Sequence, residues 1–399
     1  MPSDLRLFVG ALSLFSLASG IVDPAFNNYV HDTFAMAADT RGQLEFPREL
    51  PGFLVMVTSG LLYFLPEGRT AFVAMAGAAA GIAGLALSGS HFGAMIACMI
   101  LWSAGLHLLQ PMRSAIILGF APRDRQAAIL GSTGSITTVA VVFGAAIAWF
   151  LFMFAPREPA TYSAAFLGSA AVTALSALLV LRMRPPVHQA GPRPKLVFDW
   201  RYRLYYALSV LFGARKQIFM TFAPWVLITV FQRGPSTFAA LSVLASLLGV
   251  PWNPLIGWLI DRCGERAVLV AEGLLLFGVC MGYGFAHRLG TGAGVLAIVY
   301  SCYVLDQLLF AVGMARTTLL SRTAARPEDV TASLSMGVTL DHAVSMSIPM
   351  LGGATWMAFG FEYVFVGAAV LALASSVVAL FVPASAPLRA PLPAPWHRR

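Results

Sequence analysis

The chain has 399 residues, of which 58% are hydrophobic and only 11% are charged. Soluble domains average about 45–50% apolar and about 25% charged residues, so this composition excludes an ordinary water-soluble globular protein. The formal net charge of +8 could serve nucleic-acid binding. Most of the basic residues lie in short links between apolar runs, however, and this distribution argues against a nucleic-acid partner.

Apolar runs of about 20 residues, long enough to cross a hydrocarbon core of about 30 Å, recur along the whole chain. They predict an all-α integral membrane protein with 12 transmembrane helices. The predicted helices begin near Leu5, Leu44, Thr70, Phe92, Gln126, Thr161, Leu204, Thr237, Ala267, Gly294, Thr331 and Tyr363. We interpret the first run as a retained helix. The alternative, a cleaved signal peptide, would leave an odd number of helices.

The basic residues favour one side of the predicted bundle. If the N-terminus is cytoplasmic, the links on that side hold most of the 26 lysines and arginines, with Arg113 and Arg316 among them. The links on the other side hold only Arg41, Arg157, Arg233 and Arg288. This bias follows the positive-inside rule. We therefore expect a multi-pass protein of the inner (plasma) membrane, in contact with membrane lipids and with both termini cytoplasmic.

One polar, proline-rich link separates two sets of six helices. The predicted division is an N-terminal six-helix bundle (1–181), a cytoplasmic linker (182–203), a C-terminal six-helix bundle (204–382) and a cytoplasmic tail (383–399). The two halves also share a spacing between an arginine and a glycine. Arg113 precedes Gly134 by 21 positions, and Arg316 precedes Gly337 by the same 21 positions. A spacing that recurs in both halves indicates two pseudo-symmetric bundles.

The most specific motif is the segment Gly257-Trp-Leu-Ile-Asp261-Arg262-Cys-Gly264-Glu-Arg266. A glycine lets two helices approach closely, and an aspartate at a helix end beside arginines can form a charge network that latches neighbouring helices. The segment resembles the loop signature that the major facilitator superfamily carries between helices 8 and 9. The equivalent first-half segment keeps Gly60 and Arg69 but departs from the pattern, because it lacks the Asp-Arg pair.

The resemblance implies a secondary transporter built of two parallel six-helix repeats, with the binding site at their interface. It also implies a cytoplasmic gate formed by Gly257, Asp261, Arg262, Gly264 and Arg266.

Ionisable groups at bilayer depth are costly, so they indicate function by default. A rise of about 1.5 Å per residue places several of them at one level near the midplane. A cation that faces a low-dielectric cavity can bind a carboxylate or phosphate, which predicts a substrate-binding set of Arg215, Lys216, Gln217, His107, Gln307 and Trp225. Histidine titrates near neutral pH, which predicts a proton-coupling set of Asp341, His342 and Asp306. The structural alternative is that Arg215 and Lys216 only neutralise the two aspartates.

A second polar cluster lies nearer the predicted extracellular side, where Pro24, Pro47 and Pro51 weaken the first two helices. We predict an extracellular gate formed by Asp23, Asn27, Glu45, Arg48 and Glu49. The alternative is a structural ion pair of Arg48 with Asp23 or Glu49.

The sequence contains no nucleotide-binding loop of the Gly-x-x-x-x-Gly-Lys-Ser/Thr type, so an ion or solute gradient must supply the energy. We predict secondary active transport of a small polar or amphiphilic, anionic solute by alternating access, coupled to protons, with sodium as the alternative ion. We expect a monomer without a cofactor or a metal site. The four cysteines, expected as free thiols, show no metal-ligand spacing. The alternatives are a drug or amphiphile exporter, a lipid flippase or scramblase, and a receptor or scaffold. An enzyme is disfavoured, because no nucleophile–base set is present.

Overall fold

The computed structural model describes residues 3–34, 38–155, 158–184, 198–231, 233, 235–290 and 292–384. Within these ranges, the side chains at 27–28, 31, 38–43, 45, 225, 228–229, 235–236 and 238–239 lie outside the description.

The described chain folds entirely into helices and the short links that join them. The α-helices are α1 (Ser3–Phe34), α2 (Ala38–Phe53), α3 (Val55–Leu61), α4 (Glu67–Leu87), α5 (Phe92–Phe120), α6 (Gln126–Phe154), α7 (Pro159–Leu181), α8 (Arg203–Thr229), α9 (Pro235–Cys263), α10 (Glu265–Phe285), α11 (Ala293–Leu309), α12 (Gly313–Thr323), α13 (Glu328–Phe359) and α14 (Phe361–Leu380). Short 3₁₀ turns add η1 (Arg123–Arg125), η3 (Trp200–Tyr202), η4 (Ala286–Leu289) and η5 (Phe310–Val312). Because α2 continues into α3, and α11 into η5 and α12, these segments form the twelve predicted transmembrane rods.

The second rod is broken where the prolines predicted a weak helix. Pro47 and Pro51 lie inside α2, which ends at Phe53. The backbone N–H of Met56, two residues after the break at Leu54, donates to Oγ1 of Thr339 in α13 at 2.9 Å. The broken rod is therefore held by a helix from the other end of the chain.

Nine helices of the described chain are long and apolar enough to cross a membrane by length and composition. The helices outside this set are α2, α3, α8 and α13. They carry many of the ionisable residues that the sequence placed at bilayer depth, since Arg48 and Glu49 lie on α2, Arg215 and Lys216 on α8, and Asp341 on α13. These helices thus bring part of the charge into the protein interior, and Glu272 and Asp306 bring the rest from α10 and α11.

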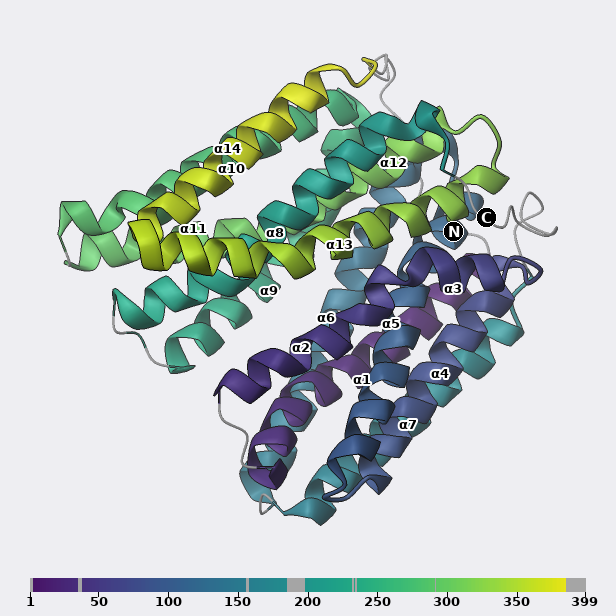
Figure 1. The fold of residues 1–399 in the computed structure, drawn as a ribbon. Coiled ribbons are helices and arrows are strands. Elements are labelled where there is room, and N and C mark those ends of the chain that lie inside the picture. Colours follow the sequence, from purple (N-terminus) through teal and green to yellow (C-terminus); the bar gives the residue numbers. More distant parts are fainter. Residues whose placement is uncertain are drawn as a thin grey trace.

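The helices form two groups that follow the chain (Figure 1). Helix α1 packs on α6 and α7, and α4 packs on α5 and α7. In the other group, α10 packs on α14, and α8 packs on α13 and α14. Two seams join the groups, one between α6 and α9 and one between α13 and α2, α3 and α5. In Figure 1 the groups lie close together near the start of α1 and diverge toward its far end. The predicted boundaries at 181 and 203 stay a prediction, and 185–197 lie outside the described residues.

At the membrane face where α1 begins, here called the Ser3 face, the described links carry Arg123, Arg125, Arg182, Arg184, Arg201 and Arg326. Two arginines that the sequence counted among these links are not there. Arg113 lies inside α5, almost two turns before the helix ends, and Arg316 lies inside α12 and is only 6% exposed. Both predictions were wrong because each helix continues for seven residues past its arginine, to Phe120 in α5 and to Thr323 in α12.

The seam between α6 and α9 depends on a glycine, as the motif predicted. A Cβ atom at Gly257 would overlap the carbonyl oxygen of Ala127 in α6. Helix α9 then ends at Cys263, and Gly264 with φ of 82° turns the chain into α10. A residue with a side chain would be strained in that left-handed conformation.

Replacing Gly257 by alanine should push α6 and α9 apart. The added methyl group meets backbone, which cannot rotate away, and overpacking of this kind costs about 1–3 kcal/mol. We expect Gly257→Ala to lower the melting temperature of the purified protein. The matched control is Gly249→Ala in the same helix, where an added Cβ meets no atom within 4 Å. Equal melting temperatures for the two variants would contradict the close contact.

Candidate functional site

A polar cavity lies between the two groups of helices. Its volume of about 680 Å³ is within the range of roughly 300–1,000 Å³ typical of small-ligand sites. Helices α1, α5 and α6 line it on one side, and α9, α11, η5 and α12 line it on the other. A smaller hollow of about 240 Å³ adjoins the cavity and shares Gln110, Ser114, Gly313 and Thr317 with it.

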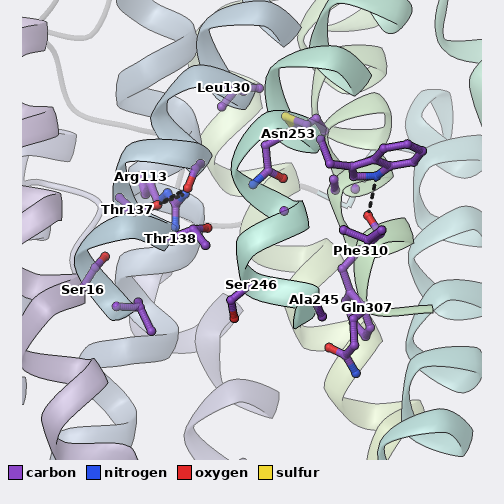
Figure 2. A pocket seen from close by; sticks show the side chains of 18 of the residues that line it. Ser16, Arg113, Leu130, Thr137, Thr138, Ala245, Ser246, Asn253, Gln307 and Phe310 are labelled. Atoms are coloured by element: carbon purple, nitrogen blue, oxygen red, sulfur yellow. Dashed lines mark hydrogen bonds between the residues drawn. The ribbon is translucent and has the colours of Figure 1, made fainter. Parts of the chain in front are cut away.

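Hydroxyl and amide groups make up most of the polar lining. They belong to Ser16, Gln110, Ser114, Thr137, Thr138, Ser242, Ser246, Asn253, Gln307 and Thr317. Figure 2 shows Ser16, Thr137 and Thr138 on one side of the space, and Ser246, Asn253 and Gln307 on the other. Groups that both donate and accept hydrogen bonds suit a polar solute.

Arg113 brings a positive charge into the wall of the larger cavity. Its Nη2 donates to Oγ1 of Thr137 at 3.5 Å (Figure 2). Among the described residues, no carboxylate lies within ion-pair distance of Arg113. Its guanidinium is therefore available to an anion that enters the cavity.

The other buried cations are balanced by carboxylates. Nη1 of Arg215 donates to Oδ1 of Asp306 at 2.6 Å, and its Nη2 lies 3.8 Å from Oε1 of Glu272. Nη1 of Arg316 donates to Oε2 of the same Glu272 at 3.4 Å. All four residues are at most 6% exposed. Two cations and two carboxylates thus form a neutral chain across α8, α10, α11 and α12.

Aromatic rings complete the surroundings of these two arginines. The guanidinium of Arg316 lies 3.9 Å from the ring centroid of Phe212, and that of Arg215 lies 5.3 Å from the same ring. The negative faces of aromatic rings stabilise cations, and more strongly where water is excluded.

Lys216 forms a separate pair with Asp341. Its Nζ lies 2.9 Å from the carboxylate, and Oγ of Ser345 donates to the same carboxylate at 3.2 Å. Asp341 lines the smaller hollow, whereas Arg215 and Lys216 line neither cavity. The geometry thus agrees with the structural alternative, in which both cations pair with aspartates.

The remaining predicted substrate-binding residues separate in the structure. Gln307 lines the larger cavity. Gln217 donates to Thr221 one turn along its own helix at 3.2 Å, and His107 faces Ser103 and Glu49. The side chain of Trp225 lies outside the described residues. Helical spacing put these residues at one depth, but it did not determine which direction each side chain takes.

The predicted coupling residues Asp341 and His342 face different partners. Asp341 is paired with Lys216, whereas Nδ1 of His342 lies 2.9 Å from Oε2 of Glu49. Consecutive residues of a helix point about 100° apart, so these two groups do not act as one unit.

The predicted extracellular gate divides in a similar way. Arg48 interacts electrostatically with Asp23 of α1, and its guanidinium lies 6.0 Å from the ring centroid of Trp102. Glu49 turns instead toward the two histidines. The side chains of Asn27 and Glu45 lie outside the described residues.

Asp261 of the motif contacts the opposite group of helices. Its carboxylate accepts hydrogen bonds from the backbone N–H groups of Ala127 and Ala128, at 3.3 and 2.8 Å, in the first turn of α6. A carboxylate there satisfies orphan donors and complements the helix dipole, which stabilises a helix by about 1 kcal/mol.

The arginine that completes this contact is Arg322. It lies 2.9 Å from Asp261 and 2.7 Å from Glu265. The predicted gate residue Arg262 stacks on Trp258 at 4.9 Å, and no ion pair of Arg266 occurs among the described residues. The first-half seam has a related contact, since Oγ1 of Thr331 in α13 donates to Glu67 at 2.9 Å. Phe64 stands at the position equivalent to Asp261, and Glu67, three residues later, supplies the carboxylate of this contact.

Sequence reasoning missed Arg113, Arg316, Glu272, Glu265 and Arg322 as site residues. The repeat contained a signal for two of them, because Arg113 and Arg316 are the equivalent residues of the two halves. Both were interpreted as topogenic charges. Glu272 was not among the predicted site residues, and only its contacts with Arg215 of α8 and Arg316 of α12 reveal its role.

Removal of Glu272 should destabilise the protein strongly. Glu272→Ala leaves two buried arginines with one carboxylate, and breaking a buried ion pair costs about 3–5 kcal/mol. The measurement is thermal unfolding of the purified protein. Asp199→Ala is the matched control, because the side chain of its ion-pair partner Arg201 is exposed to solvent. Exposed ion pairs contribute at most about 1 kcal/mol to the free energy of unfolding. Similar unfolding of the two variants would argue against the buried chain.

The comparisons with known proteins agree with this architecture. The chain aligns over 95% of its length with the human organic anion transporter MFSD10 (TETRAN), covering 100% of that chain at 14% identity and a TM-score of 0.74. It aligns over 95% with the transporter FucP in an outward conformation, covering 98% of it at 13% identity and a TM-score of 0.74. It aligns over 96% with the proton:xylose symporter XylE, covering 96% of it at 11% identity and a TM-score of 0.78.

These identities indicate a shared fold only. A search of curated proteins found no significant match. The model of the Major Facilitator Superfamily matches residues 50–302, which is more than half of the chain. Together with the twelve helical rods, this match shows that the chain belongs to the major facilitator superfamily of membrane transporters.

Proposed function

We propose that the protein moves a small polar solute with an anionic group across the membrane by alternating access of its two helix groups. The observation that carries this proposal is Arg113, a cation in the wall of the central cavity with no carboxylate partner among the described residues. In a cavity of low dielectric, such a cation attracts a carboxylate or phosphate strongly.

The rest of the lining supports the same substrate class. Asn253, Gln307 and the serine and threonine hydroxyls provide hydrogen-bonding groups on both sides of the cavity, and Trp252 adds an apolar surface. In this proposal Arg215 and Lys216 do not contact the solute directly. They shape the second group of helices through their aspartate partners, and Gln307 is retained from the predicted set.

The neighbouring structures do not decide between substrate classes. One is described as an organic anion transporter and another as a proton:xylose symporter. The second candidate function is export of drugs or amphiphiles, or lipid movement, on the same fold. It would be favoured if ligands bound without Arg113.

The gate belongs to the same proposal. Asp261, Arg322 and the first turn of α6 form a contact that must break when the Ser3 face opens. We infer that the Ser3 face is cytoplasmic, from the basic links, and that this arrangement is closed on the cytoplasmic side. The division of the chain at 182–203 would then separate the two moving bundles.

A ligand screen by thermal shift, run beside Arg113→Ala, tests the anion site. Binding to the folded state raises the melting temperature, by mass action. We expect anionic metabolites to stabilise the original protein and to lose this effect in Arg113→Ala. Arg123→Ala, in the exposed turn η1, is the matched control and should keep it. Ligands that are cationic or apolar and survive Arg113→Ala would instead favour export of drugs or lipids.

We also propose that transport is coupled to protons through Asp306. Arg215 has two carboxylates within reach, Asp306 at 2.6 Å and Glu272 at 3.8 Å. Neutralising Asp306 would let Arg215 move toward Glu272 and shift α11 relative to α8. Ionisable groups at bilayer depth commonly serve in such relays.

Asp306→Asn in proteoliposomes tests the coupling. The amide oxygen still accepts a hydrogen bond from Arg215 and Glu272 stays 3.8 Å from that arginine, so the loss of stability should be smaller than in Glu272→Ala, which removes the acceptor as well. We expect accumulation of solute driven by a pH gradient to be lost while solute exchange without a gradient continues. Accumulation that persists in Asp306→Asn would exclude this residue from coupling. Accumulation that requires a sodium gradient instead of a pH gradient would show that sodium, not the proton, is the coupling ion.

A further inference from the structure

Three side chains from three helices converge at the seam between the two groups. Glu49 comes from α2, His107 from α5 and His342 from α13. Oε2 of Glu49 lies 2.9 Å from Nδ1 of His342 and 3.9 Å from Nε2 of His107. The two imidazole rings stand edge to face with centroids 4.6 Å apart. One ligand atom from each residue lies within 4.8 Å of the other two.

This donor set suits a divalent transition metal ion. Two imidazole nitrogens and one carboxylate oxygen are ligands that zinc and its neighbours bind, often with a fourth position left to water. Metal–ligand bonds of about 2.0–2.1 Å in a tetrahedral site place neighbouring ligand atoms about 3.3 Å apart. The observed separations of 2.9 and 3.9 Å fall on either side of that value.

The surroundings orient His107 for this role. Its Nδ1 lies 2.9 Å from the carbonyl oxygen of Ser103, which can only accept a hydrogen bond. Nδ1 must therefore carry the proton, and Nε2 presents its lone pair toward Glu49. The hydroxyl of Ser103 donates in turn to the carbonyl oxygen of Arg48, which ties α5 to α2 beside the ligand. Metal-binding histidines are commonly fixed by such a bond from the second ring nitrogen.

A glycine gives the two rings room against α2. A Cβ atom at Gly52, one turn after Glu49, would lie 2.8 Å from Cδ2 of His107 and 2.8 Å from Cδ2 of His342. Both imidazoles therefore rest directly on the backbone of α2, next to the carboxylate that the same helix supplies. Both histidines are also buried, at 8% and 5% exposure, whereas the carboxylate of Glu49 remains partly exposed to an entering ion.

We propose that Glu49, His107 and His342 bind one divalent transition metal ion of the zinc class at the seam between the two groups of helices. Because α2 and α5 belong to one group and α13 to the other, the ion links the groups in the present arrangement. Metal binding then stabilises this arrangement over any in which α13 moves away. This site is separate from the cavity of Arg113 and does not depend on the proposed substrate.

The test is metal binding to the full-length protein, stripped with a chelator and then titrated with Zn²⁺ or, for its visible spectrum, with Co²⁺. We expect one ion per chain, a tetrahedral Co²⁺ spectrum and a rise in melting temperature. His107→Gln, His342→Gln and Glu49→Gln should each weaken binding at least tenfold. The matched control is His287→Gln, because His287 pairs with Glu362 at 3.2 Å without a third ligand, and it should bind like the original protein.

Two further measurements guard against variants that fold poorly. X-ray absorption of the zinc-loaded original protein should show a shell of nitrogen and oxygen only, with imidazole scattering and no sulfur. Gly52→Ala keeps all three ligands but displaces the rings, and should weaken binding. Sulfur ligation, binding that is unchanged in the triple glutamine variant, or no binding at micromolar Zn²⁺ would overturn the proposal and leave Glu49 and His342 as an ion pair.

Discussion

Charge that is buried at bilayer depth must be compensated, and this constraint organises the interior of the protein. In the second group of helices, Arg215 and Arg316 share Asp306 and Glu272, so that four ionised groups from four helices form a neutral chain. None of the four helices can move freely without leaving an uncompensated charge, which costs several kcal/mol. While all four groups are ionised, these ion pairs therefore hold the four helices together, and neutralising one of the groups would release that constraint.

The two halves use equivalent residues for different purposes. Arg316 is buried against Phe212 and paired with Glu272, whereas its counterpart Arg113 lines the cavity with only a hydroxyl as its described partner. The pseudo-symmetry of the fold places both arginines near the central space. The carboxylate on α10 then neutralises one of them, and the other remains available. The two repeats thus differ through a single additional acid, which pairs with Arg316 and leaves Arg113 without a carboxylate among the described residues.

The seams show how neighbouring rods recognise each other. Glycine permits contact in the seam between α6 and α9, where Gly257 meets Ala127, and Asp261 then caps the first turn of α6 from the opposite group. In the other seam, Gly52 lets His107 and His342 rest on α2. Close backbone contact without side chains leaves polar groups at the edges of each seam to make the specific contacts. These polar contacts are local to each seam, as the hydrogen bonds of Asp261 to α6 and the contact of Glu49 with His342 show.

Much of the fold could be predicted from the sequence, because apolar runs of membrane length and the bias of basic residues are local patterns. The twelve rods begin within a few residues of the expected positions, and the break in the second rod follows its prolines. The candidate site could be predicted only in part. Depth along a helix follows from counting residues, so Arg215, Asp306, His107 and Asp341 do lie deep in the protein. The partner that each side chain contacts depends on how its helix is rotated about its axis and on which helix lies beside it. Counting residues along the sequence gives neither.

The sequence by itself determined that this is a membrane protein of twelve helices, that its charges lie on particular rods, and that one motif resembles a known transporter family. Only the tertiary structure decided that Arg215 is neutralised, that Arg113 faces the cavity and that Glu49 meets two histidines from other helices. The physical reason is that hydropathy and turn chemistry act within about 20 residues, whereas compensation of buried charge acts between residues as far as 125 positions apart, from Lys216 to Asp341.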